Sequence, residues 1–141
     1  MKVVQFLMGG HGMTEGRDNV SRTLDFVRKV QEGGCLELFD DFVHPDFRNH
    51  TAEPGGAADR EGARATMAAL HAALEDLSIE IVHCFGQGDL VATTKVVRGR
   101  HVGNWLGQAP TGKRVGLRIM DFLRFTDGRI IEHWSTHTPL D

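Results

Sequence analysis

The stretch FTDGRIIEHWSTHT, residues 125–138, decides the fold because it combines a tight turn with a long final strand. Thr126-Asp127-Gly128 has the chemistry of a hairpin turn, since aspartate and glycine tolerate a positive φ. The turn therefore joins a strand predicted at 114–125 to a last strand at 129–137. Side chains alternate along a strand, so one face of the last strand is predicted to carry Ile131, His133, Ser135 and His137.

The rest of the chain places helices before strands. Helical spacing of apolar residues and their flanking caps and stops predict three helices, at 18–33, 36–42 and 59–76. A brief extended piece at 46–51 and a loop rich in glycine and proline at 52–61 separate the second helix from the third. Two further strands are predicted at 78–85 and 90–102, joined by the compact turn 86–89.

Helices followed by an antiparallel meander predict an α+β domain. The N-terminal helices should pack on one face of a curved, mostly antiparallel sheet and form a cone that encloses a cavity. The 141 residues fit one domain, 1–141, without an internal repeat. Residues 1–13 are expected to form a loose tail, and Met13 is a second plausible start.

Composition narrows the class of protein. The formal net charge of -3 and the scattered Lys and Arg residues argue against nucleic-acid binding. The opening apolar run is broken by Gln5, which is poor for a signal peptide, and no run is long enough to span a membrane. Cys35 and Cys84 lack CxxC spacing, which favours a reduced, cytoplasmic protein over a disulfide framework.

The candidate chemistry centres on an acid among apolar neighbours. Asp121 shares its strand face with Ile119 and Leu123, so it lies either at a wet strand end or buried with a partner. Pairing through the 126–128 turn brings Asp121 close to His133, Ser135 or His137. An Asp–His pair in a partly dry cavity is a ready general base. Alternatively, Asp121 is a structural acid paired with Arg129 or with a residue on a neighbouring strand.

Several other site types find little support. The spacing of His133 and His137, without other clustered ligands, is a weak metal signal, so no metal and no cofactor are predicted. Ser135 has no GxSxG context for a nucleophile, and the glycines near residues 99–107 do not form GxGxxG.

Three motifs together resemble the SnoaL-like polyketide cyclases, a branch of the NTF2-like superfamily. They are HPDFRNH at 44–50, GRHVGNWLGQAPTGKRV at 99–115 and RFTDGRIIEHW at 124–134, and the resemblance runs from about residue 18 to the end. It implies an α+β cone whose mouth accepts a flat, hydrophobic, carbonyl-rich molecule, and frequently a dimer packed through the open sheet face. Family cyclases close a ring by intramolecular aldol condensation without metal or cofactor, and an acid on the last strand takes a proton from carbon.

The resemblance also implies an exchange of residues between strands. The family's catalytic aspartate falls at Ser135, whereas the histidine that assists it falls at Asp121. Asn49 matches a polar position that faces ligand, and His101 matches the histidine of GRHVG. The chain has no tyrosine, so the tyrosine donor of the similar ketosteroid isomerases is missing. An oxyanion donor is therefore expected among Trp105, Asn49, Arg98, Arg100 and the histidines.

These observations predict a small cytoplasmic enzyme of secondary metabolism, a homodimer that acts on a polyketide-like or polycyclic carbonyl substrate. Asp121 is the predicted proton acceptor, with His133, His137 and His101 as helpers. The predicted substrate-binding residues are Asn49, His50, Trp105, Ser135, Phe47, Leu123 and Ile119. The alternatives are a hydroxylase partner, an isomerase or an epoxide hydrolase of the same fold, or a non-catalytic protein that binds small molecules in the same cavity.

Overall fold

The computed structural model describes residues 10–140, with side chains described from Glu15 onward. The first helix, α2, spans Gly10–Phe26 and continues without a break into one π-helical turn, η1, at Val27–Glu32. It therefore begins within the segment expected to be a tail, and the remainder of that expectation, residues 1–9, lies outside the described residues. Gly34 follows with a φ of 74°, which a glycine adopts without strain and which ends the helix.

The remaining helical segments, η2, α3 and α4, lie close to the two remaining predicted helices. η2 at Leu36–Leu38 and α3 at Phe39–Phe42 together cover the predicted second helix. α4 spans Arg60–Ala73, and the Asp59 carboxylate caps it by accepting a hydrogen bond from the Gly62 N–H at 2.9 Å. α4 ends before the predicted Asp76 because the chain is already extended at Leu74, where the next strand begins.

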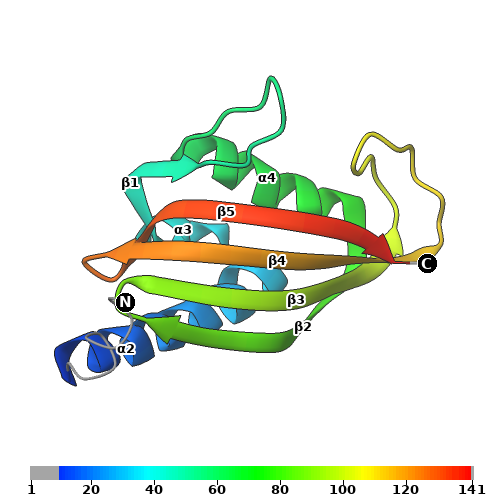
Figure 1. Cartoon of the computed structure of the whole chain (residues 1–141). Helices are drawn as coiled ribbons and strands as arrows, with labels where there is room; N and C mark the ends of the chain where they lie inside the picture. The colour runs from blue at the N-terminus through cyan, green and yellow to red at the C-terminus, as the bar shows by residue number, and fades with distance from the viewer. Residues whose placement is uncertain (1–9, 141) are drawn as a thin grey trace.

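Five strands form one mixed sheet in the order β1-β5-β4-β3-β2 (Figure 1). They are β1 at Val43–Asn49, β2 at Leu74–Gln87, β3 at Leu90–His101, β4 at Arg114–Thr126 and β5 at Arg129–Leu140. β1 runs parallel to β5, and the other neighbours are antiparallel. The α+β fold predicted from the order of helices and strands is confirmed.

The β4–β5 hairpin has the predicted turn and an unpredicted irregularity. Asp127 and Gly128 both have positive φ, at 51° and 75°. The register shifts between Arg124 and Phe125, so that Phe125 pairs with Ile130. This bulge breaks the simple alternation along β5: Ile130 is buried, whereas Ile131, expected on the face of His133, is only half-buried.

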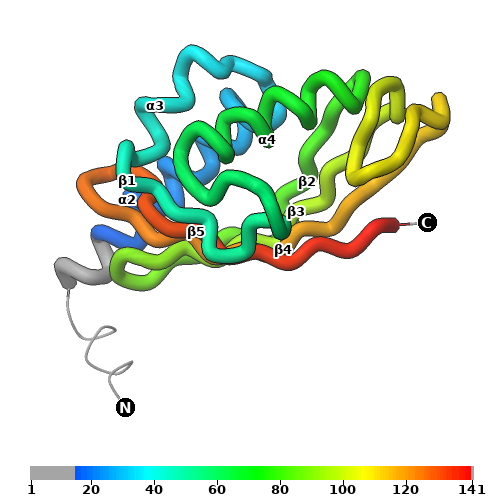
Figure 2. Tube along the Cα trace, turned by 90° about the horizontal axis from the view of Figure 1, so that it is seen from above, coloured from blue at the N-terminus to red at the C-terminus, as the bar shows by residue number. Residues whose placement is uncertain are grey.

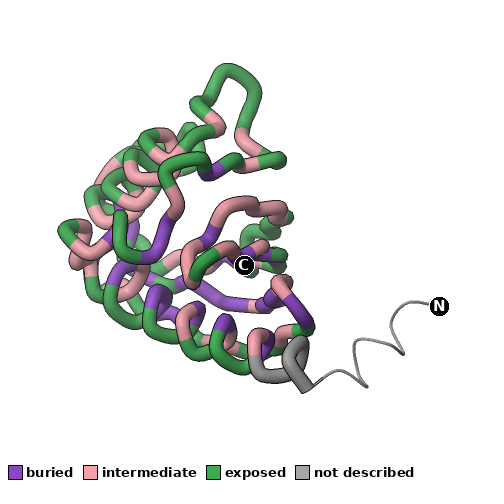
Figure 3. Tube along the Cα trace, turned by 90° about the vertical axis from the view of Figure 1, so that its left-hand side faces the viewer, coloured by how far each residue is buried: buried purple, intermediate pink, exposed green. Residues whose placement is uncertain are grey.

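The helices cover one face of the sheet and leave the other bare (Figure 2). Buried residues gather between the helices and the sheet in Figure 3, where they form two clusters. The first cluster includes Phe26, Phe39, Phe42, Phe47, Leu123 and Phe125. The second, towards the opposite end of the strands, is built on Val27, Ala73, Leu74, Ile79 and Val97. The two clusters hold the helical layer against the sheet.

Candidate active site

Three neighbouring strands bring a charged cluster into the space beneath the helices. Lys95 on β3 and Asp121 on β4 form an ion pair at 3.4 Å between Nζ and Oδ2, and both side chains are only 3% exposed. The Thr93 hydroxyl donates a hydrogen bond to Oδ1 of Asp121. His133 Nε2, on β5, lies 3.3 Å from Oδ2. Because unpaired buried charges are costly, these contacts are what allow an ionised carboxylate to exist here.

The strand register explains why these residues meet. Asp121 lies directly opposite Thr93, and Lys95 lies two residues further along β3, on the same face. His133 lies opposite Leu123, which is again two residues from Asp121 on the same face. All four side chains therefore point from adjacent strands into one layer.

Lys95 is the functional candidate that sequence reasoning missed. Asp121 was expected to pair with an arginine or with a residue on a neighbouring strand, and its partner is this lysine of β3. Lys95 also donates a hydrogen bond to Gln31 Oε1 at 3.0 Å, which ties β3 to the π-helical turn. A signal was present in the sequence, because Lys95 is an even number of residues from Val91 and Val97. It therefore shares the face of the strand on which these two apolar residues are buried.

The surroundings of Asp121 set its protonation. Burial on its own would raise the pKa of this carboxyl group, because it disfavours the charged form. The positive charge of Lys95, followed by the contact with His133 and the hydrogen bond from Thr93, outweighs burial and holds the pKa of Asp121 well below its ordinary value. Asp121 is therefore a carboxylate across the physiological range, and a weak base.

The cluster opens into a cavity of about 90 Å³. Aromatic and aliphatic side chains from the first core cluster form most of its wall, including Phe26, Phe39, Phe47, Leu123 and Ile130. Its lining residues with solvent exposure are Gln31 of η1, Asn49 of β1, Ala63, Thr66 and Met67 of α4, and His133 of β5. The cavity is smaller than the roughly 300 Å³ at the lower end of small-molecule sites, so it can hold only part of a drug-sized molecule.

Five of the predicted site residues line this cavity: Asp121, His133, Asn49, Phe47 and Leu123. The His133 ring is stacked over Phe47 with ring centroids 6.4 Å apart. Asn49 uses its side-chain oxygen to accept hydrogen bonds from the backbone N–H and the hydroxyl of Thr51, at 3.1 and 3.2 Å. This turn fixes the end of β1 at the mouth of the cavity.

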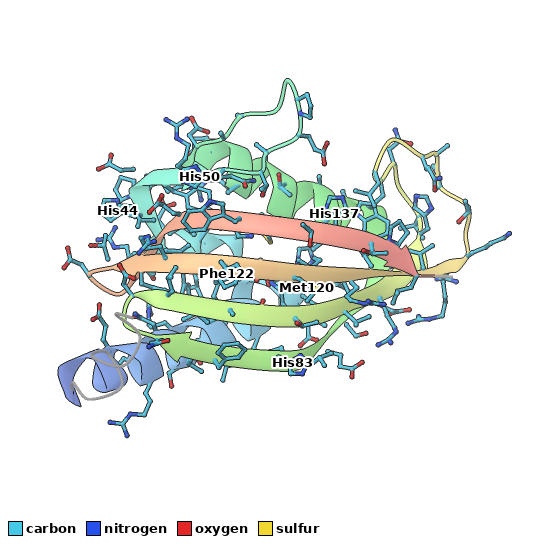
Figure 4. All side chains as sticks on the ribbon, in the orientation of Figure 1. His44, His50, His83, Met120, Phe122 and His137 are labelled. Carbon is cyan, nitrogen blue, oxygen red and sulfur yellow. The ribbon has the colours of Figure 1, made fainter. Side chains whose placement is uncertain are left out.

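Three predicted residues near the same strands lie outside the cavity lining. Ser135 is opposite Asp121, but its N–H donates to Thr51 Oγ1 at 2.9 Å. His50 lies 2.7 Å from Glu132 and stacks on Trp134 at 4.8 Å between ring centroids. His137 is exposed near the C-terminal end of β5. Figure 4 shows His50 and His137 well apart along the upper edge of the sheet.

The last three predicted residues, Trp105, Ile119 and His101, are also absent from the cavity lining. Trp105 and Ile119 pack against the second core cluster. His101 is 1% exposed, with Nδ1 3.2 Å from the Thr111 hydroxyl and the edge of its ring towards Trp105. Six residues of strand separate His101 from Lys95, about 20 Å at roughly 3.3 Å per residue. His101 therefore lies far from the charged cluster, whereas Ile119 is the cross-strand neighbour of Lys95 and borders the cluster without lining the cavity.

Two further properties concern the described part of the chain as a whole. Within residues 15–140, no three His, Cys, Asp or Glu side chains converge in a way that would hold a metal ion. No helix in the described region combines the length and apolar character needed to cross a bilayer.

Comparison with known proteins gives consistent matches along most of the chain. The family model described as SnoaL-like polyketide cyclase matches residues 21–137. Nogalonic acid methyl ester cyclase of Streptomyces nogalater is 32% identical over 108 residues, covering 71% of this chain and 76% of that protein. Aklanonic acid methyl ester cyclase of Streptomyces galilaeus is 30% identical over 123 residues, covering 81% and 83%. The structure of TsrD from Streptomyces laurentii aligns with a TM-score of 0.77 at 26% identity, covering 86% of this chain and 89% of that one.

Proposed function

Because the chain belongs to the SnoaL-like polyketide cyclase family, we propose that it closes a ring in a polyketide by acid–base chemistry on a carbonyl-rich substrate. The observation that carries this proposal is the buried cluster of Lys95, Asp121 and His133 at the wall of an apolar cavity. Two similar proteins are named as cyclases of nogalonic acid methyl ester and aklanonic acid methyl ester, which supports a related substrate class here.

His133 is the group best suited to take the proton from carbon. Asp121 was the predicted acceptor, but its lowered pKa and three polar partners make it a weak base. The imidazole of His133 has two distinct ring nitrogens, of which one can donate a hydrogen bond while the other accepts a proton. With Nε2–H donated to Asp121, Nδ1 of His133 carries the lone pair that accepts the proton. Asp121 then orients the ring and stabilises the imidazolium that forms.

The shape of the cavity suggests how such a substrate binds. A volume of about 90 Å³ admits the reacting end of the molecule, while the remaining rings lie over the mouth between β1 and α4. Asn49 and Thr66 provide polar contacts at this mouth, and Met67 provides an adaptable apolar surface. Exclusion of water around the reacting end strengthens the electrostatic effect of the charged cluster.

The direct test is incubation of the purified protein with the methyl esters of nogalonic and aklanonic acid. Ring closure by aldol addition leaves the mass unchanged, so products are separated by chromatography and identified by NMR. We expect a cyclised isomer with the wild type and not with His133→Gln. Binding of either ester without any product would favour a non-catalytic binding protein. A product other than the cyclised isomer would favour the isomerase, hydroxylase or epoxide hydrolase alternatives.

We also propose a homodimer formed through the bare face of the sheet. Phe85, Met120 and Phe122 are 65%, 53% and 55% exposed on this face, and Figure 4 shows Met120 and Phe122 projecting from β4 there. Apolar patches of this kind usually mark an interface. The free thiols of Cys35 and Cys84 support a reducing, cytoplasmic environment for the assembly.

A further inference from the structure

Lys95 has no role in the predicted chemistry, yet it lines the cavity. Among residues 15–140 it is the one lysine or arginine whose side chain is buried. An aliphatic residue at this position would pack against the same wall without the cost of desolvating a charge. Asp121 and Gln31 compensate the burial of this cation, and its place in the cavity lining lets it also meet an anionic or polarised atom of a bound molecule.

We propose that Lys95 is a catalytic residue that binds the substrate's carbonyl oxygen and holds the negative charge of the enolate. This role deepens the proposed cyclase function and rests on it. The ammonium donates a hydrogen bond to the carbonyl oxygen next to the carbon from which His133 removes a proton. As charge builds on that oxygen, the attraction to Lys95 strengthens, which lowers the barrier rather than only the dissociation constant.

The geometry around Asp121 supports this assignment. Lys95 Nζ and His133 Nε2 both contact Oδ2 of Asp121, at 3.4 and 3.3 Å, so the cation and the ring lie around one oxygen atom. An enolisable carbonyl carries its acidic C–H and its oxygen only two bonds apart. Lys95 and His133 both line the cavity, so a carbonyl group that lies there is placed with its oxygen towards Nζ and its acidic C–H towards Nδ1, the ring nitrogen turned away from Asp121.

The hydrogen-bonding capacity of Lys95 leaves a donor for substrate. An ammonium group has three N–H donors, of which Gln31 takes one and the ion pair with Asp121 engages another. In the part of the chain that the structure describes, no further acceptor contacts Nζ. The ion pair with Asp121 suits Lys95 to the role of a hydrogen-bond donor and not of a nucleophile.

Among the other donors expected from the sequence, Asn49 is an uncharged group at the cavity mouth, and the arginines and Trp105 are engaged elsewhere. Arg98 and Arg100 form ion pairs with Glu80 and Glu75 on β2, and all four side chains are substantially exposed. Trp105 packs against the second core cluster. With tyrosine missing from the chain, Lys95 is the charged donor that the cavity offers to an enolate oxygen.

The complete step balances without an added reagent. His133 takes a proton from carbon, and the electron pair of the broken C–H bond moves onto the carbonyl oxygen beside Lys95. The enolate carbon then attacks a second carbonyl of the same molecule, forming the new C–C bond and an alkoxide. The imidazolium returns its proton to that alkoxide, so the product is an isomer of the substrate and His133 is neutral again.

A phenol measures the site without requiring turnover, because its phenolate is a stable oxygen anion that resembles an enolate. The probe is 4-nitrophenol, whose two protonation states differ in absorbance. We expect wild-type protein to bind the phenolate at least about 10-fold more tightly than the phenol, which lowers the pKa of the bound probe by one unit or more. Lys95→Met should abolish this preference, whereas Lys113→Met, which removes an exposed charge, should leave it unchanged.

Controls for folding separate the outcomes. Lys95→Met leaves Asp121 unpaired, so Lys95→Met/Asp121→Asn is tested in parallel and should also lack phenolate preference. Preference retained in either variant, or missing from the wild type, would overturn the role of Lys95. Borohydride trapping of a substrate adduct on Lys95 would overturn it in favour of covalent catalysis. If the wild type prefers phenolate but closes a ring in neither ester, the cyclase proposal alone is refuted. If Lys95→Met closes the ring at an unchanged rate, the Lys95 proposal alone is refuted.

Discussion

Asp121 on β4 lies directly opposite Ser135 on β5 in the antiparallel register. These are the two positions at which the resemblance to the cyclases exchanges an acid, and a cross-strand pair of this kind shares one face about 5 Å apart. The shift by one strand places the carboxylate beside β3, where Thr93 and Lys95 contact it. An acid at Ser135 would lie one strand further away, roughly 5 Å more from these partners. The acid at position 121 therefore has a cationic neighbour, which fits the proposed role of His133 as the base.

Replacing Asp121 with asparagine should remove both activity and stability. The variant leaves Lys95 as an uncompensated buried cation, and breaking a buried pair in this way costs about 3–5 kcal/mol. It also removes the acceptor that orients His133. Urea denaturation, together with the cyclisation assay, measures the two effects.

The double variant Lys95→Met/Asp121→Asn separates these two losses. With both charges gone, we expect most of the unfolding free energy to return while turnover stays absent. A double variant as unstable as Asp121→Asn would show that the ion pair is not the source of the loss.

The protonation of Asp121 predicts how stability depends on pH. Its pKa is held below the ordinary value of 3.8 in the folded protein, so the folded state favours the carboxylate. The resulting stabilisation is complete above the unfolded pKa of about 4 and is lost as the pH falls below it towards the folded value. Unfolding free energies measured from pH 6 downward should fall more steeply for the wild type than for Asp121→Asn. Parallel curves for the two proteins would contradict this.

His133→Gln should slow the reaction while leaving the fold intact. Glutamine preserves a polar side chain above Phe47 but cannot accept the proton, and loss of a general base typically costs 10²- to 10⁴-fold in rate. His137→Gln is the matched control, since this exposed histidine should be replaceable with less than a twofold change.

The fold was accessible from sequence because local patterns and the overall arrangement agree. Asp59 capped its helix and Asp127-Gly128 formed its hairpin turn, as their side-chain and backbone chemistry predicts. The cavity was harder to predict because it depends on relations between distant segments. The parallel pairing of β1 with β5 leaves no local signal, and Lys95 gains its importance only from the β3–β4 register. His101 illustrates the converse, since a motif match placed it in the site while the strand length places it far away.

His101 should therefore be a structural residue. Its ring is 1% exposed and fills space beside Trp105, and Nε2 has no hydrogen-bond partner among the described residues. His101→Ala should lower the unfolding free energy by about 2–5 kcal/mol through the cavity it creates. His101→Phe should recover most of that loss, since it refills the space without the unpaired nitrogen. Unchanged kcat in the phenylalanine variant, measured well below its melting temperature, would support this role, and a large fall in kcat would return His101 to the catalytic set.

The bare sheet face gives the last prediction, that Phe122→Glu converts a dimer to a monomer. Met120, Phe122 and Phe85 lie on the uncovered face, and an introduced carboxylate would be desolvated in any interface built on them. Ala69→Glu is the matched control, because it adds the same charge on an exposed position of α4, in the helical layer. Light scattering at micromolar concentration should give a dimer for the wild type and Ala69→Glu, and a monomer for Phe122→Glu. A monomeric wild type, or a Phe122→Glu variant that remains dimeric, would mean that this face is not the contact between subunits.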